Sequence, residues 1–284
     1  MKPAAFNYVK PMTLDDALGL LSKHSEGAQI LAGGQSLMPT LNMRLSAPDL
    51  LIDINGLAEL SGVKLEGNHI RIGALTRHVD VENSSVIAEH CPLIASAMPH
   101  IAHPAIRNRG TFGGSIALAD PAAELPACIC ALEAKIEVVG EGGERKIEAK
   151  DFFTGLYETD LQEGEIVTAV EVPIVMSNSR LAFDELSRRH GDYAMAGLAV
   201  NARMTDKKID DINICFFAIS ATPVLAEGAA KILINSALDN DSIKKAVEQL
   251  ERDLDPLSDL YATRIMKMHY AKELMKRNLG NWVS

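Results

Sequence analysis

The chain has 284 residues, of which 47% are hydrophobic and 23% are charged, a composition typical of an ordinary soluble globular protein. Its length exceeds the usual size of one hydrophobic core, so we expect two domains. The formal net charge of −10 argues against nucleic acid or an anionic membrane surface as a partner, since both require basic patches.

The amino-terminal stretch predicts a helix, a strand and a second helix. Thr13 is placed to cap the first helix, and the apolar residues between Leu14 and Leu21 fall on one face at helical spacing. Residues 29–31 are predicted to form a short buried strand. Residues 37–41 are predicted to start a helix with a proline in its first turn. This pattern indicates an α/β scaffold.

A glycine loop joins that strand to the second helix. Adjacent Gly33 and Gly34 free the backbone to adopt positive φ and let an anion approach the N–H groups, and Ser36 can add a hydroxyl donor. A helix N-terminus after such a loop presents unpaired N–H groups. The segment matches neither G-x-G-x-x-G nor G-x-x-x-x-G-K-[ST], so neither a Rossmann site nor a P-loop is supported. Taken alone, a glycine pair is most often a tight turn.

A second glycine loop follows in the middle of the chain. Residues 50–54 are predicted as a strand and residues 63–72 as a hairpin, after which short helices occupy residues 76–109. The loop itself pairs adjacent glycines with hydroxyls on either side, at residues 111–115. Two such loops in one chain suggest a single large phosphorylated cofactor held from two sides. A third glycine pair, at residues 142–143, has no hydroxyl partner and is predicted to be a plain hairpin turn.

The cysteines favour a reducing compartment. No segment reaches the roughly 18 apolar residues that span a bilayer, and the amino terminus lacks the apolar stretch of a signal peptide, so we expect a cytoplasmic protein without membrane insertion. Cys128 and Cys130 lie in an apolar, helical run without a second close cysteine pair. We therefore expect buried structural cysteines and no metal ligands.

The second domain is predicted to begin after a polar linker at residues 176–179. Strands are expected at residues 181–186, 197–204 and 209–219, and a last helix at residues 260–277. An apolar stripe on that helix is predicted to be core, and it comprises Tyr261, Ile265, Met268, Ala271 and Met275. Two basic pairs, Arg107/Arg109 and Arg188/Arg189, fit either solvated surface or a role near a cofactor or partner.

Three segments resemble the FAD subunits of molybdenum hydroxylases, the family that includes carbon monoxide dehydrogenase medium subunits and the flavin module of xanthine dehydrogenase. Residues 32–37 resemble the first flavin-binding signature, and residues 101–115, continuing through 119–126, are similar to the second. Residues 188–194 resemble the segment that opens the core of the family's C-terminal domain. The resemblance covers nearly the whole chain.

The resemblance implies an α+β fold. Residues 1–175 would form a two-part FAD-binding domain of the PCMH type, which is vanillyl-alcohol-oxidase-like, with subdomains at about 1–55 and 56–175. Residues 178–284 would form a smaller α/β C-terminal domain with a short antiparallel sheet and helices.

The resemblance also implies how FAD is held, without a covalent link. The two glycine loops would wrap the pyrophosphate and ribityl portion, chiefly through backbone amides. The matching positions are Leu31, Ala32, Gly33, Gly34, Gln35, Ser36 and Leu37 in the first loop and Thr111, Phe112, Gly113, Gly114 and Ser115 in the second.

Further cofactor contacts follow from matching positions outside the loops. Ile101 and Ala102 match residues that line the adenine, Val167 matches an apolar position near the ring system, and Tyr193 matches an aromatic residue close to the isoalloxazine. Glu124 matches an acidic position that can hydrogen-bond the polyol. Asp120 is a second candidate for that bond, or else the cap of a helix starting at Pro121.

The resemblance implies an electron-transfer role. Substrate would be oxidised at a molybdenum cofactor in a large subunit, electrons would pass through two [2Fe-2S] clusters in a small subunit, and this flavin would deliver them to an external acceptor. The expected assembly is a dimer of such heterotrimers, a heterohexamer. We expect no catalytic residue and no metal site in this chain. Two alternatives are a stand-alone FAD-dependent oxidoreductase of the same wider fold and a binding module that has lost its flavin.

Overall fold

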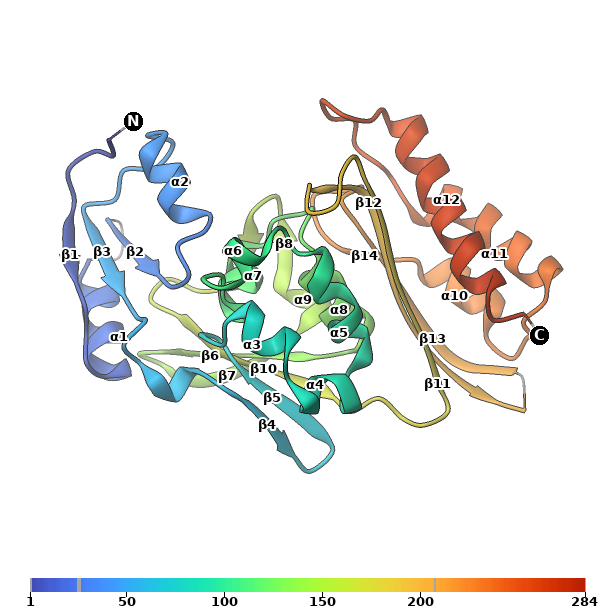
Figure 1. Cartoon of the computed structure of the whole chain (residues 1–284), viewed down its shortest axis with the longest axis horizontal. Helices are drawn as coiled ribbons and strands as arrows, with labels where there is room; N and C mark the ends of the chain where they lie inside the picture. Colours follow the sequence, from blue (N-terminus) through green and yellow to red (C-terminus); the bar gives the residue numbers. More distant parts are fainter. Residues whose placement is uncertain (1, 25–26, 207, 284) are drawn as a thin grey trace.

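The computed structural model describes residues 2–24, 27–206 and 208–283. Three groups of elements follow one another along the long axis of the molecule, each built around its own sheet (Figure 1). The central group lies between the amino-terminal group and the C-terminal sheet with its helices.

The amino-terminal group is a three-stranded parallel sheet with two helices. The order is β1 (Asn7–Val9), β3 (Leu50–Asp53), β2 (Ala28–Leu31), with α1 (Leu14–Lys23) and α2 (Leu37–Asn42) beside it. The predicted cap is confirmed, because the Thr13 hydroxyl accepts from the Asp16 amide at 3.1 Å. The prediction that residues 29–31 are buried is wrong, since every residue of β2 is partly exposed.

The central group is a five-stranded antiparallel sheet with short helices packed on it. The strand order is β4 (Val63–Glu66), β5 (His69–Gly73), β10 (Ile166–Pro173), β6 (Lys135–Gly140) and β7 (Gly143–Glu148). Both predicted hairpins are confirmed, as is the run of short helices. The short helices and the other short elements of the central group are η1 (Ala58–Leu60), α3 (His78–Glu82), α4 (Ser85–His90), α5 (Pro92–Ala97), η2 (Met98–His100), α6 (Pro104–Arg107), α7 (Phe112–Leu118), α8 (Glu124–Ala131), α9 (Ala149–Phe152), β8 (Phe153–Gly155) and β9 (Glu158–Thr159).

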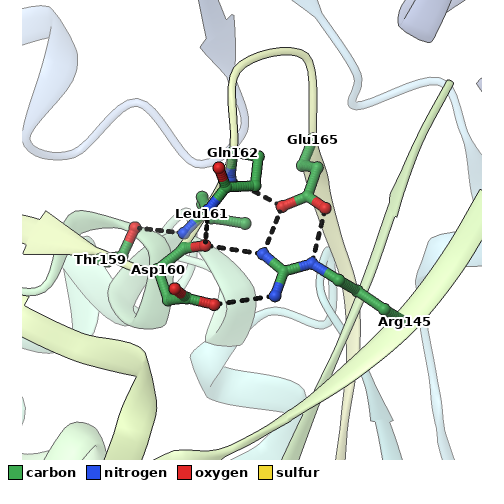
Figure 2. A network of polar contacts seen from close by, with 6 residues as sticks. All are labelled: Arg145, Thr159, Asp160, Leu161, Gln162 and Glu165. Carbon is green, nitrogen blue, oxygen red and sulfur yellow. Dashed lines mark hydrogen bonds and ion pairs between the residues drawn. The ribbon is translucent and has the colours of Figure 1, made fainter. Parts of the chain in front are cut away.

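An arginine fastens one end of the β6–β7 hairpin to the loop before β10. The Arg145 guanidinium bonds both carboxylate oxygens of Glu165, at 2.7 and 2.8 Å, and the Asp160 carboxylate at 2.8 Å (Figure 2). Bidentate pairs of this kind are among the stronger side-chain contacts. The network supports the hairpin that carries the third glycine pair, which is confirmed as a turn.

The C-terminal group is a four-stranded antiparallel sheet covered by helices. Its strands are β11 (Ser179–Ser187), β12 (Ala194–Thr205), β13 (Lys208–Phe217) and β14 (Val224–Leu225), and its helices are α10 (Glu227–Leu233), α11 (Asn240–Asp253) and α12 (Arg264–Gly280). The strands of this group precede its helices in the sequence, as predicted. The three helices cover one face of the sheet (Figure 1).

The other face of this sheet packs against the hydrophobic core of the central group. Alternate residues of β12 and β13, such as Ala199 and Phe217, join the hydrophobic cluster that contains α8, whereas Leu198 and Phe216 face α10–α12. All eight residues of α8 are buried. The central and C-terminal groups therefore share one continuous apolar interface.

The start of the last helix differs from the sequence prediction. Thr263 caps α12 by accepting from the Met266 amide at 3.3 Å, so the helix begins at Arg264. Tyr261 precedes it and is 59% exposed, with the Arg188 guanidinium 4.9 Å from its ring, and Ile265 is 81% exposed. The predicted core stripe is wrong at these two positions and holds for Met268, Ala271 and Met275.

Candidate functional site

The first glycine loop presents backbone amides that the rest of the described chain leaves unused. The loop lies between β2 and α2, and the amides of Gly33, Gly34, Gln35 and Ser36 donate to no acceptor within residues 2–24, 27–206 and 208–283. Gly34 has φ +70°, a left-handed conformation that favours glycine. Ser36 is the N-cap of α2, yet its hydroxyl makes no cap bond. These groups point to an anion as the ligand.

The first glycine loop is in direct contact with the start of the second. A Cβ on Gly33 would lie 2.6 Å from the Arg109 carbonyl oxygen and 2.9 Å from the Gly110 Cα. Only glycine allows this approach. Segments far apart in the sequence thus form one continuous wall.

Most backbone amides of the second loop already donate to acceptors within the protein. Thr111 caps α7 by accepting from the Gly114 amide at 3.2 Å, and the Ser115 amide donates to the Thr111 carbonyl at 3.1 Å. The Phe112 and Gly113 amides donate to the Thr76 and Ala74 carbonyls, at 2.9 and 2.8 Å. The Phe112 side chain is fully buried in the core. The free amides for an anion are therefore concentrated in the first loop.

Asn55 and Arg77 hold the two loops in place. The Asn55 amide group donates to the Ala32 carbonyl at 2.7 Å, and Arg77 donates to Asn55 Oδ1 at 2.6 Å and to the Arg109 carbonyl. Sequence reasoning missed both residues. A signal existed for Asn55, because β2 and β3 are parallel and a polar residue just after β3 lies at the same sheet edge as the first loop.

A groove with a volume of about 500 Å³ opens beside the first loop. It is lined by Leu31, Ala32, Gly33, Gly34, Gln35, Met38, Pro39, Asn42, Asp53, Asn55, Ile106 and Arg109. Arg109 is exposed and brings a positive charge to the rim. Free amides beside a guanidinium suit a phosphate or pyrophosphate group.

Arg107 has a structural role, unlike Arg109. Its side chain is buried, and its Nη1 donates to the Ile101 and Ala102 carbonyls at 3.0 and 3.1 Å, while Nε bonds Glu82 at 2.8 Å. These bonds support Ala102 at φ +46°. The interpretation of Arg107 as solvated surface is therefore wrong.

The His78 ring lies beside Gly110, the residue just before the second loop, and the His78 backbone amide donates to the Gly110 carbonyl at 2.9 Å. Its side chain is buried, and neither ring nitrogen finds a partner among the described residues. Burial lowers the pKa of His78 to about 4, so the ring is neutral at physiological pH.

The acidic candidates lie at the start of α8. The Asp120 carboxylate accepts from the Ala122 amide at 2.9 Å, and α8 begins at Glu124. Asp120 therefore closes a turn and does not cap a helix starting at Pro121. Glu124 is 8% exposed, and burial raises the pKa of its carboxyl to about 8.

The predicted ring-contacting residues occupy different environments. Val167 on β10 is buried, whereas Tyr193, just before β12, is 66% exposed. Tyr193 and Tyr157 both lie near Asp120. Tyr157 is exposed and has φ +57°, and no sequence pattern singled it out.

Membrane spans and metal clusters are both absent from the described part of the chain. None of the helices described here is long and apolar enough to cross a membrane. Among the residues that the structure describes, no group of three or more histidine, cysteine, aspartate or glutamate side chains could hold a metal ion.

Comparisons with known proteins cover the chain nearly end to end. Residues 4–175 match the FAD binding domain in molybdopterin dehydrogenase, and residues 181–281 match the CO dehydrogenase flavoprotein C-terminal domain. The 6-hydroxypseudooxynicotine dehydrogenase complex subunit alpha of Paenarthrobacter nicotinovorans is 39% identical over 281 residues, covering 99% of this chain and 95% of that protein.

Carbon monoxide dehydrogenases are similar in sequence and in structure. The medium chain from Afipia carboxidovorans is 37% identical over 259 residues, covering 91% of this chain and 90% of that protein. A chain of the carbon monoxide dehydrogenase from Hydrogenophaga pseudoflava is 35% identical and matches with a TM-score of 0.96, over 99% of this chain and 98% of that one.

Proposed function

The chain belongs to the FAD-binding subunits of the molybdenum hydroxylase family, and from this premise we propose that it holds one FAD non-covalently and passes electrons to an external acceptor. The chain is thus an oxidoreductase subunit. The electrons would come from iron–sulfur clusters of a partner chain.

One observation carries the proposal. Gly33, Gly34 and Gln35, whose amides donate to no acceptor among the described residues, line a groove of about 500 Å³ together with Arg109. Gly33 packs so closely on the second loop that a Cβ would block the arrangement. A pyrophosphate satisfies such amides and gains from the nearby guanidinium, so the residues present fit FAD.

Each part of the chain has a proposed task at the cofactor. The first loop, from Leu31 to Leu37, would bind the pyrophosphate through its amides. The second loop, from Thr111 to Ser115, would form the opposite wall, and Ile101 with Ala102 would line the adenine. Asp120 and Glu124 would bind the polyol, with Val167 and Tyr193 beside the ring system.

The electron-transfer chemistry would be supplied by the FAD and not by side chains of this chain. Bound FAD supplies the capacity to take up electrons singly and release them in pairs. The chain's own residues bind and orient it. Asn55 and Arg77 contribute by fixing the two loops relative to each other.

We propose a heterohexameric assembly, a dimer of heterotrimers with a large molybdenum-binding subunit and a small iron–sulfur subunit. The names of the relatives as medium chain or complex subunit support partner chains. A cytoplasmic location is supported by four free, buried cysteines. We also propose a domain boundary between residues 175 and 178, supported by the change from the central sheet to the C-terminal sheet.

Recovery of the chain from its native cells tests this assignment. We expect an affinity-tagged chain to co-purify with two other chains, and the complex to contain FAD, iron and molybdenum. The same chain produced alone should contain FAD without iron or molybdenum. Recovery from native cells as a single chain without iron or molybdenum would contradict the proposed electron-transfer role.

A further inference from the structure

A buried carboxylate lines the groove beside the first glycine loop. Asp53, the last residue of β3, is 8% exposed and belongs to the groove wall. Its Oδ1 accepts from the backbone amide of Asn55 at 2.9 Å and from Asn55 Nδ2 at 2.7 Å, and its Oδ2 accepts from the Tyr8 hydroxyl at 2.5 Å. Because like charges repel, a carboxylate does not attract a phosphate. Its hydrogen bonds are therefore the better indication of its role.

The carboxylate of Asp53 determines which way the side-chain amide of Asn55 faces. Asn55 Nδ2 donates to Asp53 Oδ1 and to the Ala32 carbonyl, each at 2.7 Å. Asn55 Oδ1 accepts from the Arg77 guanidinium at 2.6 Å. With the amide reversed, its oxygen would face two acceptors and its NH₂ group would face a donor. The chemistry of the three partners therefore allows one orientation of Asn55.

The orientation of Asn55 in turn sets the direction of a free amide in the first loop. The peptide bond between Ala32 and Gly33 is trans and planar, so its C=O and N–H point in opposite directions. Because the Ala32 carbonyl is bonded to Asn55, the Gly33 N–H points away from Asn55. That N–H donates to no acceptor among the described residues. Arg77 also bonds the Arg109 carbonyl, against which Gly33 packs.

We propose that Asp53 is a positioning residue of the cofactor groove, which orients the Asn55 amide so that the first glycine loop presents the Gly33 N–H to the anionic group of the cofactor. This inference rests on the proposed FAD site. Asp53 acts through Asn55 and has no need to touch the cofactor. Burial by itself would raise the pKa of Asp53, but the hydrogen bonds from Tyr8 and Asn55 outweigh it and lower the pKa. The carboxyl group is therefore an ionised acceptor at neutral pH.

The test is a titration of the full chain with FAD, followed by flavin fluorescence, in the wild type and in variants of Asp53. Asp53→Ala removes the acceptor, so we expect the dissociation constant to increase at least about tenfold. Asp53→Asn keeps an oxygen that accepts from Asn55, and it should bind FAD at least as tightly as the wild type. Asp49→Ala, a change at an exposed carboxyl just before β3, should leave the affinity unchanged.

A double-mutant cycle shows whether Asp53 acts through Asn55. Asn55→Ala should also weaken FAD binding at least about tenfold, and adding Asp53→Ala to it should cause no further loss, because the amide to be oriented is already absent. Circular dichroism checks that each variant is folded. If Asp53→Ala does not fold, Asp53→Leu, which fills the space without an acceptor, replaces it in the cycle. If neither folds, Asp53→Asn decides alone.

The possible failures are distinguishable. Unchanged or tighter FAD binding in Asp53→Ala would overturn this inference while leaving the flavin site intact. A tenfold loss in Asp53→Asn would overturn it as well, because the charge and not the accepted hydrogen bond would then matter. Additive losses in the double variant would show that Asp53 does not act through Asn55. Absence of FAD binding in the wild type would instead count against the proposed function.

Discussion

Single residues decide how closely the two glycine loops approach each other. Gly33 meets the backbone of Arg109 and Gly110, whereas nothing lies within 4 Å of a Cβ placed on Gly142. Neither residue has the positive φ that would by itself require glycine. Both positions therefore tolerate a Cβ in their backbone conformation but differ in what that Cβ would meet, which makes them a useful pair.

Gly33→Ala should weaken FAD binding by at least about tenfold, or about 1.4 kcal/mol, because the added methyl group pushes the loops apart. Gly142→Ala should leave the affinity unchanged. Titration calorimetry with FAD measures both. Equal affinities for the two variants would mean that contact between the loops does not shape the cofactor site.

His78 gives the fold a pH dependence at the residue scale. Its pKa is about 4 in the folded chain and 6.5 for an unperturbed imidazole, so the unfolded chain binds the extra proton between these values. Stability from the neutral ring is present above about pH 6.5 and is lost as pH falls toward 4. The loss amounts to at most about 3 kcal/mol.

Urea unfolding of wild type and His78→Gln should therefore diverge in this pH window. The wild type should lose more unfolding free energy than the variant on acidification, since glutamine does not titrate. His24→Gln, at an exposed position, should behave like the wild type. The same slope for His78→Gln and the wild type would show that His78 is not buried in neutral form.

At the element scale, α7 and α12 begin with the same kind of cap. Thr111 accepts from the Gly114 amide at 3.2 Å, and Thr263 accepts from the Met266 amide at 3.3 Å. Only the first cap lies at the proposed cofactor site. Thr111→Ala and Thr263→Ala should each cost about 1 kcal/mol of stability, but only Thr111→Ala should weaken FAD binding.

Thermal unfolding and FAD titration of the two cap variants measure these effects separately. A loss of FAD affinity in Thr263→Ala as large as in Thr111→Ala would point to a general effect of stability. In that case the second loop would have no specific role in binding.

Most elements were predictable from local patterns, and the remaining errors have physical causes. The cap at Thr13 and the two hairpins depend on neighbouring residues, so the sequence revealed them. The exposure of Tyr261 and Ile265 depends on where Thr263 starts α12, which helical spacing does not indicate.

In the candidate site, too, local sequence patterns predicted some features, whereas others depend on contacts between residues that are distant in the sequence. The glycine pairs and their hydroxyls suggested one cofactor held by both loops, and the family resemblance added FAD as its identity. The bonds from Asn55 and Arg77, and the burial of Arg107, join residues distant in sequence and needed the structure. Whether each predicted residue contacts FAD stays a prediction.

On the scale of the whole molecule, the C-terminal sheet completes the core of the central group. Helix α8 packs against β12 and β13, and the four cysteines are buried around this interface. Burial raises the pKa of the Cys91 thiol to about 12 and also raises the pKa values of Cys128 and Cys215. Their thiols should therefore be unreactive in the intact chain.

A thiol reagent should label none of the four cysteines in the native full chain and all of them in denaturant. Residues 1–175 produced alone should expose Cys128 and Cys130, because the sheet that covers them is missing. Rapid labelling of the intact chain, or protection in the isolated piece, would contradict the shared core.

The flavin content of the full chain is the most direct test of the central claim. Purified chain, saturated with FAD and freed of excess, should carry about one FAD per chain, and acid precipitation should release it because no covalent link holds it. Protein that shows no flavin absorbance and no change in FAD fluorescence on titration would contradict the account.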